Sequence, residues 1–358
     1  MKCKVLTYNQ IDGTEWSRLV ASSSTGTWFQ TPEAYEFYAS QPELFKPFVI
    51  AISNDASLSE AQHSINSSLQ TLRAVCVGYV TVERNPIKQY FTRRAIIIGG
   101  PALADDCTDE EVFALMDGVR MRLKIEDCRL KISRGPIYIE TRNFNDYSKW
   151  RGAFEKAGFE YEPHLNFHVD TSLVEVVESN LGKSRKRDIR TTIREGVTIV
   201  EHPTKEQVVE YYGILKKLYE TKVKTPLFPL SFFIELNKHK DGRLLLTEYN
   251  GHIIGGTVCV ALEGKCLYEW FACGDDGVYP HVFPSCYATY AGIRYAAEHG
   301  MPRFDMMGAG TPDEAYGVRD FKARFGGKEV EHGRFLHITK SLLYRIGVSG
   351  VKLLKKLK

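Results

Sequence analysis

The fold of this chain is decided by a stretch near its C-terminal end. It reads RFDMMGAG at residues 303–310 and, after a short loop, YGVRDFKARFGG at residues 316–327. The pattern predicts a short apolar strand that ends in small residues. A basic helix is expected to follow, with an aromatic residue and a lysine as neighbours. We therefore expect the chemistry of the protein to lie where this strand and this helix meet.

The same order of elements occurs earlier in the chain, as a weak internal repeat. Residues 137–142 (IYIETR) predict a strand, and residues 150–157 predict a helix that stops at Gly158. A last strand is expected after each copy, at residues 166–170 and at residues 333–338. The repeat indicates one fold present twice, with the site kept mainly in the second copy.

Composition places the chain among ordinary globular proteins. A length of 358 residues favours two domains, and 43% hydrophobic residues suffice for two real cores. The net charge of +3 and the pI of about 8.3 are mildly basic. That balance alone does not indicate a nucleic-acid partner, because many soluble enzymes share it.

The cysteines and the N-terminus favour a cytoplasmic protein. None of the eight cysteines forms a C-x-x-C pair, and several lie in apolar strands where a thiol packs as a small hydrophobic group. A disulfide framework is not expected in a chain of this size. The N-terminal residues carry no secretory signal pattern, and no apolar run approaches the ~18 residues that span a bilayer. We expect reduced thiols and no metal site.

The order of the expected elements is strand, meander, helix, strand, helix, strand, twice over. The second meander is the clearer one, with strands at 243–249, 255–262 and 265–273 and a helix at 285–299. This order is typical of an α/β fold in which a mixed sheet is flanked by helices. It is similar to the GNAT acyltransferase fold in tandem, with domains expected at residues 1–168 and 169–339.

Short motifs spread over the chain carry a family resemblance. Together they resemble the FemABX peptidyltransferases, and more closely the FemX-like members that lack a helical arm. The resemblance implies two GNAT-like domains and transfer of an amino acid from aminoacyl-tRNA to an amine of a peptidoglycan precursor, with no cofactor. The motifs, in the family's order, are FQTPE (29–33), GGP (99–101), YIETR (138–142), GF (158–159), VD (169–170), RKRDIR (185–190), GV (196–197), FD (304–305), FK (321–322) and FG (325–326).

The resemblance implies that Lys322 is catalytic and that Phe321 positions it. Transfer of an acyl group from an ester to an amine builds negative charge on the carbonyl oxygen, and a fixed cation nearby stabilises that charge. No side chain stands out as a general base, so the resemblance implies that the substrate assists deprotonation of the amine. The alternative for Lys322 is a solvated lysine on a helix.

A basic run at residues 183–194 is the candidate phosphate-binding segment. It holds six cations in twelve residues, and helical spacing places Arg187, Arg190 and Arg194 on one face. With Arg185, these side chains suit the backbone of a tRNA acceptor end or a nucleotide diphosphate. The alternative is a solvated helix face.

Further substrate-binding residues are expected around the acceptor. The resemblance points to Gln30 and to Lys224, which replaces an arginine that the family often has. Tyr268 and Trp270 are two residues apart in a strand, so they share a face and could stack on a base or sugar, although core packing is commoner. Tyr316 precedes the FK helix and could line the same site.

Several departures from the family's pattern leave the acceptor open. Lys224 keeps the charge of arginine but loses its fork-shaped donor set. Near Gln30 the family tends to have a tryptophan and a lysine, where this chain has Tyr35, Phe37 and Tyr38. These differences keep a second hypothesis in place: a GNAT-type N-acyltransferase that acts on an amino-sugar of a surface polysaccharide or lipid with another acyl donor.

Under this second hypothesis, acyl-CoA is a donor to consider. GNAT enzymes bind its pyrophosphate on a glycine-containing loop that opens a helix. The nearest match in this chain is residues 305–310, where Asp305 stands in place of the usual arginine or glutamine. An acid beside a pyrophosphate is unfavourable and argues against CoA.

A third hypothesis is a binding protein that kept the fold and lost the reaction.

The tail at residues 340–358 predicts a basic amphipathic helix. Such a helix can pack back on the first domain, which we favour, or it can lie on an anionic membrane surface at the inner face of the membrane.

Overall fold

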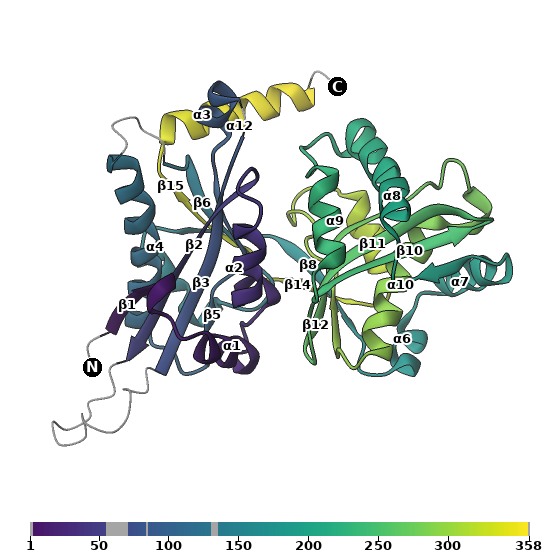
Figure 1. The fold of residues 1–358 in the computed structure, drawn as a ribbon, viewed down its shortest axis with the longest axis horizontal. Helices are drawn as coiled ribbons and strands as arrows, with labels where there is room; N and C mark the ends of the chain where they lie inside the picture. Colours follow the sequence, from purple (N-terminus) through teal and green to yellow (C-terminus); the bar gives the residue numbers. More distant parts are fainter. Residues whose placement is uncertain (1–2, 55–70, 84, 130–134, 357–358) are drawn as a thin grey trace. The chain divides into compact units, whose positions relative to one another are not determined.

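The computed structural model describes residues 3–54, 71–83, 85–129 and 135–356. Two compact units are present (Figure 1), one made of residues 1–163 and 332–358 and the other of residues 164–331. The division differs from the expected one at both ends of the second unit. The expected boundary after residue 168 falls inside a strand that belongs wholly to the second unit, and residues 332–339 belong to the first.

The first unit is a mixed sheet with helices packed on it. Its strands run in the order β1-β2-β3-β4-β6-β15-β7, with β5 paired to β3, and β4 and β6 are parallel. The strands are β1 (Cys3–Thr7), β2 (Phe45–Asn54), β3 (Thr71–Thr81), β4 (Ala95–Gly99), β5 (Ala102–Leu103), β6 (Tyr138–Asn143), β7 (Glu160–Glu162) and β15 (Arg334–Ile338). The helices are α1 (Gly13–Ser22), α2 (Pro32–Ala39), α3 (Pro86–Thr92), α4 (Asp109–Arg129), α5 (Arg151–Lys156) and α12 (Ser341–Lys356).

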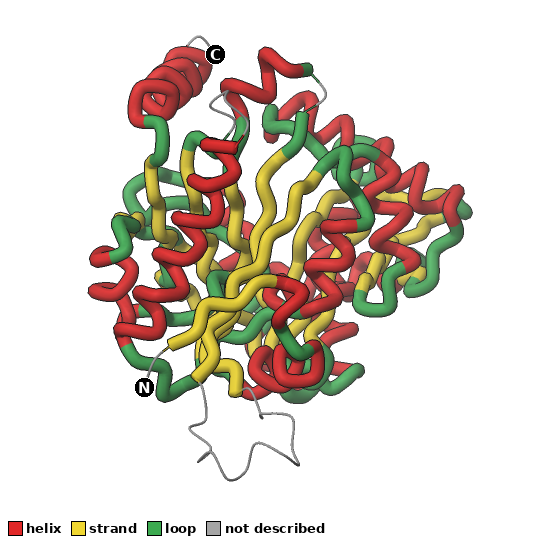
Figure 2. Tube along the Cα trace, turned by 60° about the vertical axis from the view of Figure 1, so that its left-hand side comes forward, coloured by secondary structure: helices red, strands yellow, loops and turns green. Residues whose placement is uncertain are grey.

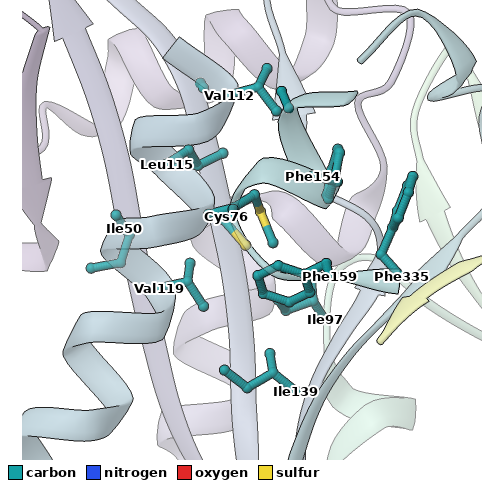
Figure 3. Packing of buried hydrophobic residues seen from close by; sticks show 14 of the residues in the cluster. Ile50, Cys76, Ile97, Val112, Leu115, Val119, Ile139, Phe154, Phe159 and Phe335 are labelled. Atoms are coloured by element: carbon teal, nitrogen blue, oxygen red, sulfur yellow. The ribbon is translucent and has the colours of Figure 1, made fainter. Parts of the chain in front are cut away.

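Helix α4 shows why this unit folds as it does. Thr108 and Glu111 exchange backbone and side-chain hydrogen bonds in a capping box that begins the helix. Apolar residues then recur along one helix face, and they pack on β2, β3 and β4 (Figure 3). This face carries Val112, Leu115, Met116, Val119 and Leu123, all buried.

The second unit repeats the architecture. Its strands run in the order β14-β8-β13-β12-β11-β10-β9, and β12 and β13 are parallel. The strands are β8 (Leu165–Asp170), β9 (Thr198–Val200), β10 (Gly242–Tyr249), β11 (His252–Leu262), β12 (Cys266–Gly274), β13 (Arg303–Asp305) and β14 (Lys328–Glu331). The helices are α6 (Val174–Asn180), α7 (Lys183–Arg194), α8 (Lys205–Leu218), α9 (Leu230–Lys238), α10 (Pro284–Glu298) and α11 (Gly317–Ala323).

The predicted meander is present as β10, β11 and β12, each antiparallel to the next. Its first turn contains Asn250 and Gly251, both with positive φ (52° and 79°), which is the backbone that an Asn-Gly hairpin turn requires. The fold class predicted from the sequence, two mixed sheets flanked by helices, is therefore confirmed (Figure 2).

The two units exchange their last strands. β8 follows β7 in the chain, yet it pairs with β13 and β14 in the second sheet. β15 follows β14, yet it pairs with β6 and β7 in the first sheet. The sequence repeat assigned each last strand to the copy before it, and that assignment was wrong. Strand periodicity reports which face of a strand is buried and carries no information on the sheet that the strand joins.

Candidate functional site

Lys322 lies on α11 and is buried, with 8% of its surface exposed. Its ammonium donates hydrogen bonds to three consecutive backbone carbonyls, those of Met306, Met307 (3.0 Å) and Gly308 (2.8 Å). An ammonium has three protons, so every donor of Lys322 is used. Lys322 is therefore neither a solvated surface lysine nor a cation with a free donor. It holds the loop that follows β13.

That loop, residues 306–310, has an unusual backbone. Met307 adopts a left-handed conformation (φ 46°), which is costly for a residue with a side chain, and Gly308 and Gly310 follow with φ of 71° and 79°. Four successive N–H groups donate inside the unit, to Phe167 O, Asp305 Oδ1, Asn166 Oδ1 and Leu165 O. The carbonyls of residues 306–308 are thereby turned toward Lys322.

This geometry corrects the pyrophosphate-loop hypothesis. The amides of residues 306–309 already have acceptors, so they cannot cradle a phosphate. The loop also does not open a helix, because α11 begins only at Gly317. Residues 305–310 are thus a carbonyl-lined loop that binds a cation of the protein itself.

Two buried carboxylates stand near the ammonium of Lys322. Burial lowers the pKa of Lys322, and the charges of Glu269 and Asp305 partly offset that effect. Burial raises the pKa of Glu269, which accepts a hydrogen bond from Thr257 (3.3 Å). The result is a compact, partly charged cluster shielded from water.

Of these two acids, Asp305 is the one whose ionised form is favoured by its neighbours. Burial would raise its pKa, but the contact with His168 (Nε2 to Oδ2, 3.1 Å) and the hydrogen bond from Asn166 (2.7 Å) outweigh burial, so the pKa is lowered. The carboxylate also accepts from the N–H of Met307. Asn166 and His168 come from the exchanged strand β8, and no motif in the sequence indicates that they contact Asp305.

Phe321 and Arg185 form a second cluster that joins α11 to α7. The guanidinium of Arg185 lies 4.5 Å from the ring centre of Phe321 and 5.0 Å from that of Phe325. It also pairs with Asp188 (3.5 Å) and is buried. The basic run predicts phosphate binding for Arg185, but the structure places its guanidinium against these rings, where it holds α11 and its lysine in place.

The other three arginines of α7 are exposed, as the helical spacing predicts. Arg187 contacts Asp188 (3.0 Å), and Arg194 contacts Glu195 (3.5 Å), while both guanidinium groups remain largely in solvent. Arg187, Arg190 and Arg194 form one row along the helix, which we call the arginine row. The row is available to a polyanion.

Tyr268 and Trp270 lie on β12 at a point where the pairing with β11 slips by one residue. The β-bulge sets Trp270 beside Phe271, with nearly parallel rings, and both rings contact Phe228 and Phe232. Trp270 is partly buried in this aromatic cluster. Tyr268 is fully buried, and its hydroxyl accepts from Arg303 at 3.5 Å. Both side chains pack within the unit.

Tyr316 and Lys224 are exposed, each beside an irregular backbone segment. Tyr316 precedes α11, and its ring lies against Gly310, where an added Cβ would meet it at 3.0 Å. Lys224 ends a π-helical turn and has φ of 57°. Strained or π-helical backbone of this kind is often found at functional sites, so both residues stay candidates for substrate contact.

Gln30 lies in the first unit and is fully buried. Its amide nitrogen donates to the carbonyls of Val77 (3.1 Å) and Ile98 (2.9 Å), and its oxygen accepts from the N–H of Val77 (2.8 Å). The side chain thus ties two strands to the segment before α2. This leaves Gln30 a structural role in place of the substrate contact that the resemblance implied.

Sequence reasoning also missed a carboxylate at the start of α10. Asp276 accepts from the N–H of Ser285 (3.0 Å) and from its hydroxyl. A helix N-terminus is a natural anion site, and here a side chain of the protein fills it. The only sequence signal would have been an acid in the loop before a helix that begins at Pro284.

The described residues contain neither a metal-binding cluster nor a membrane-spanning helix. Within residues 3–54, 71–83, 85–129 and 135–356, no group of three or more His, Cys, Asp or Glu side chains could hold a metal ion. In the same part of the chain, no helix combines the length and the apolar character that crossing a bilayer requires.

Comparison with known proteins defines the class. Residues 183–322 match the model of the acetyltransferase (GNAT) domain. The second unit thus carries a GNAT-type domain, and the first unit repeats its architecture, so the chain has two GNAT-like units in tandem. No curated protein sequence matches the chain.

Among solved structures, FemX is similar along the whole length. It shares 14% identity, covers 97% of this chain and 99% of its own, and has a TM-score of 0.69. L-PGS from Bacillus licheniformis is similar at 12% identity, 96% and 97% coverage and a TM-score of 0.53. A tandem GNAT protein from the clavulanic acid biosynthesis pathway is also similar. It shares 8% identity, the match covers 94% of this chain and 98% of that protein, and the TM-score is 0.52. The resemblance to FemABX proteins is confirmed at the level of the fold.

Proposed function

We propose that the protein is an aminoacyltransferase that moves an amino acid from aminoacyl-tRNA to an amine of a peptidoglycan precursor. The observation that carries the proposal is the arginine row of α7, an exposed cationic stripe on the same unit as the buried Lys322 cluster. Charged tRNA is found in the cytoplasm, so we place the reaction there, at or near the inner face of the membrane.

The arginine row suits a nucleic-acid donor. Guanidinium groups bind phosphates through two parallel hydrogen bonds, and three of them one helical turn apart can follow a sugar–phosphate backbone. Neutralising phosphates releases counterions, so binding should weaken steeply as salt rises. On binding, Arg187 and Arg194 would exchange their carboxylate partners, Asp188 and Glu195, for phosphates.

Two features oppose acyl-CoA as the donor. The carboxylate of Asp276 already fills the anion site at the start of α10. The amides of residues 306–309 are all engaged within the unit. A pyrophosphate at either place would have to displace a bond of the protein, and at the first it would also meet a like charge.

The reaction needs one new bond and one broken bond. The acceptor amine attacks the ester carbonyl, a C–N bond forms, the C–O bond to the tRNA ribose breaks, and the amine proton leaves with the ribose oxygen. Negative charge passes through the carbonyl oxygen. The buried ammonium of Lys322 supplies a fixed positive charge nearby, which costs no reorganisation during the reaction. Lys322 also fixes the 306–308 loop.

The acceptor contacts are the exposed candidates Lys224 and Tyr316. Lys224 presents a cation from a left-handed backbone position, suited to a diphosphate or carboxylate of the precursor. Tyr316 presents an aromatic ring at the entry of α11. We assign no acceptor contact to Tyr268, because it is fully buried.

The test measures binding and transfer with the full-length chain. The protein is titrated with aminoacyl-tRNA and, separately, with acyl-CoA at two salt concentrations. Transfer of labelled amino acid from a mixed charged-tRNA pool to muropeptide precursors is followed by mass spectrometry. We expect salt-dependent tRNA binding and a product heavier by one aminoacyl group. Arg187→Ala with Arg190→Ala should weaken binding at least ~10-fold.

Arg18→Ala with Lys205→Ala is the matched control, because both are exposed cations outside the row. It should bind as wild type. CoA binding without tRNA affinity would refute the proposal and support an N-acyltransferase of amino-sugars. Binding of a precursor without any transfer from either donor would indicate a protein that kept the fold and lost the reaction.

A further inference from the structure

Helices α3 and α12 lie at the same end of the first unit. α3 lies between β3 and β4, just before Ala95, and α12 follows the end of β15. Ala95 pairs with Ile139, and Ile338 pairs with Tyr138, so the start of β4 and the end of β15 lie at the same edge of the sheet. Figure 1 shows both helices at this end, and the turned view of Figure 2 agrees.

Large apolar side chains are exposed on both helices. On α3, Ile87 is 74% exposed and Phe91 is 53% exposed, with Tyr90 between them at 45%. On α12, Leu342 is 70% exposed and Ile346 is 54% exposed. Single exposed apolar residues need no explanation, but a cluster of five at one end of a unit is typical of an interaction site. We call these five residues the α3–α12 surface.

The outward face of α12 is set by how the helix is anchored. The ring of Tyr344 packs edge-on against Tyr138 (5.6 Å between centroids), and Lys340 donates to the carbonyl of Gly135 (2.9 Å). Leu342 and Ile346 are four residues apart and so share a helix face, on the side away from Tyr344. The tail therefore packs back on the first unit through one face and leaves another apolar face uncovered.

The two chain segments that carry this surface are rich in Lys and Arg, and Lys88 on α3 pairs with Glu83 (3.0 Å). Residues 85–94 contain three Lys or Arg and residues 339–358 contain six, and neither segment contains an acid. The whole chain carries +3, so removing these nine charges leaves −6 for the remainder. Basic side chains beside exposed apolar ones match the negative surface of a bilayer and its apolar layer beneath.

We propose that the α3–α12 surface docks on a bilayer that contains anionic lipids. The apolar side chains insert at the level of the head groups, and Arg345 extends its charged end to the lipid phosphates. Lys88 would exchange its partner Glu83 (3.0 Å) for a phosphate. The proposal does not depend on the donor or acceptor of the reaction. It gives the protein a fixed position at the membrane surface.

The test is co-sedimentation of the full-length chain with vesicles of phosphatidylcholine alone and with vesicles that also contain phosphatidylglycerol. We expect binding to the anionic vesicles only, weakened by added salt. Phe91→Ser with Leu342→Ser should reduce this binding at least ~10-fold, because each helix loses one inserted side chain. The control, Leu173→Ser with Val278→Ser, removes exposed apolar residues from the second unit and should bind as wild type.

Circular dichroism and sedimentation velocity accompany the vesicle assay. Wild-type protein that ignores anionic vesicles, or a folded Phe91→Ser/Leu342→Ser variant that binds like wild type, would overturn the proposal. A wild-type dimer that this variant dissociates, without any vesicle binding, would also overturn it and make the surface an interface between two copies.

Discussion

Replacing Lys322 by methionine tests the arrangement on which the site depends. Methionine has nearly the length of lysine, so the change removes the ammonium with little change in volume. Three backbone carbonyls then lose their donor. The bond to Met306 is buried and its loss should cost about 1–3 kcal/mol, while the half-buried carbonyls of Met307 and Gly308 can be hydrated and should cost less. We expect a total of about 2–4 kcal/mol.

The loss should first appear in the loop itself. The amides of residues 306–309 are hydrogen-bonded within the unit, so their hydrogen exchange reports the free energy of opening the loop. A loss of about 2–4 kcal/mol corresponds to exchange faster by roughly 30-fold to several hundred-fold. Hydrogen-exchange mass spectrometry of peptides that cover residues 303–311 measures this directly.

Lys328→Met is the matched control, since Lys328 is an exposed lysine of the same unit. It should leave the loop unchanged, and peptides from β2 and β3 serve as an internal reference in the other unit. Lys322→Arg keeps a charged donor and should give an intermediate rate. Exchange in Lys322→Met within about threefold of wild type would refute the argument, because the ammonium would then not be holding the loop in solution.

Three further changes test other parts of the structure. Phe335→Ala removes a ring stacked on Phe154 (4.0 Å between centroids) and should destabilise the first unit by about 3–5 kcal/mol in urea unfolding. Asp305→Asn should flatten the acid side of the stability–pH curve. The lowered pKa of Asp305 gives stability that is present above its unfolded value of about 3.8 and is lost as pH falls below it, which acid titration by circular dichroism follows. Asp276→Ala removes the acceptor of Ser285 and should cost about 1 kcal/mol in thermal unfolding.

Local pattern was enough to predict part of the fold, such as the meander and the helix at 285–299, because helix and strand periodicity depend on neighbours in the chain. The Asn-Gly turn of the meander and the cap of α4 likewise depend only on residues that are close in the chain. The arginine row followed from helical spacing in the same way. Lys322 was singled out through a family resemblance, and its three carbonyl partners lie fourteen to sixteen residues away, in a loop whose backbone no propensity rule gives.

Contacts between segments that are far apart in the sequence could not be predicted from local pattern. Arg185 and Phe321 are far apart in sequence, so the sequence does not show that they are in contact. The basic run around Arg185 therefore predicts a phosphate ligand, whereas its guanidinium stacks on the ring of Phe321. Gln30 was placed with the substrate, yet its amide bonds to Val77 and Ile98. Both side chains are polar groups that the fold buries and pairs, and burial is a property of the tertiary structure.

The strand exchange links the fold to the site. β8 follows the first unit in the chain but belongs to the second, where it supplies the acceptors for the amides of Met306 and Ala309. The same strand contributes Asn166 and His168, which hold the carboxylate of Asp305. A GNAT domain cut from the chain at the expected boundary after residue 168 would therefore lose the partners of its own loop. A unit that begins at residue 164 keeps these partners, so the second unit is complete only when it includes β8.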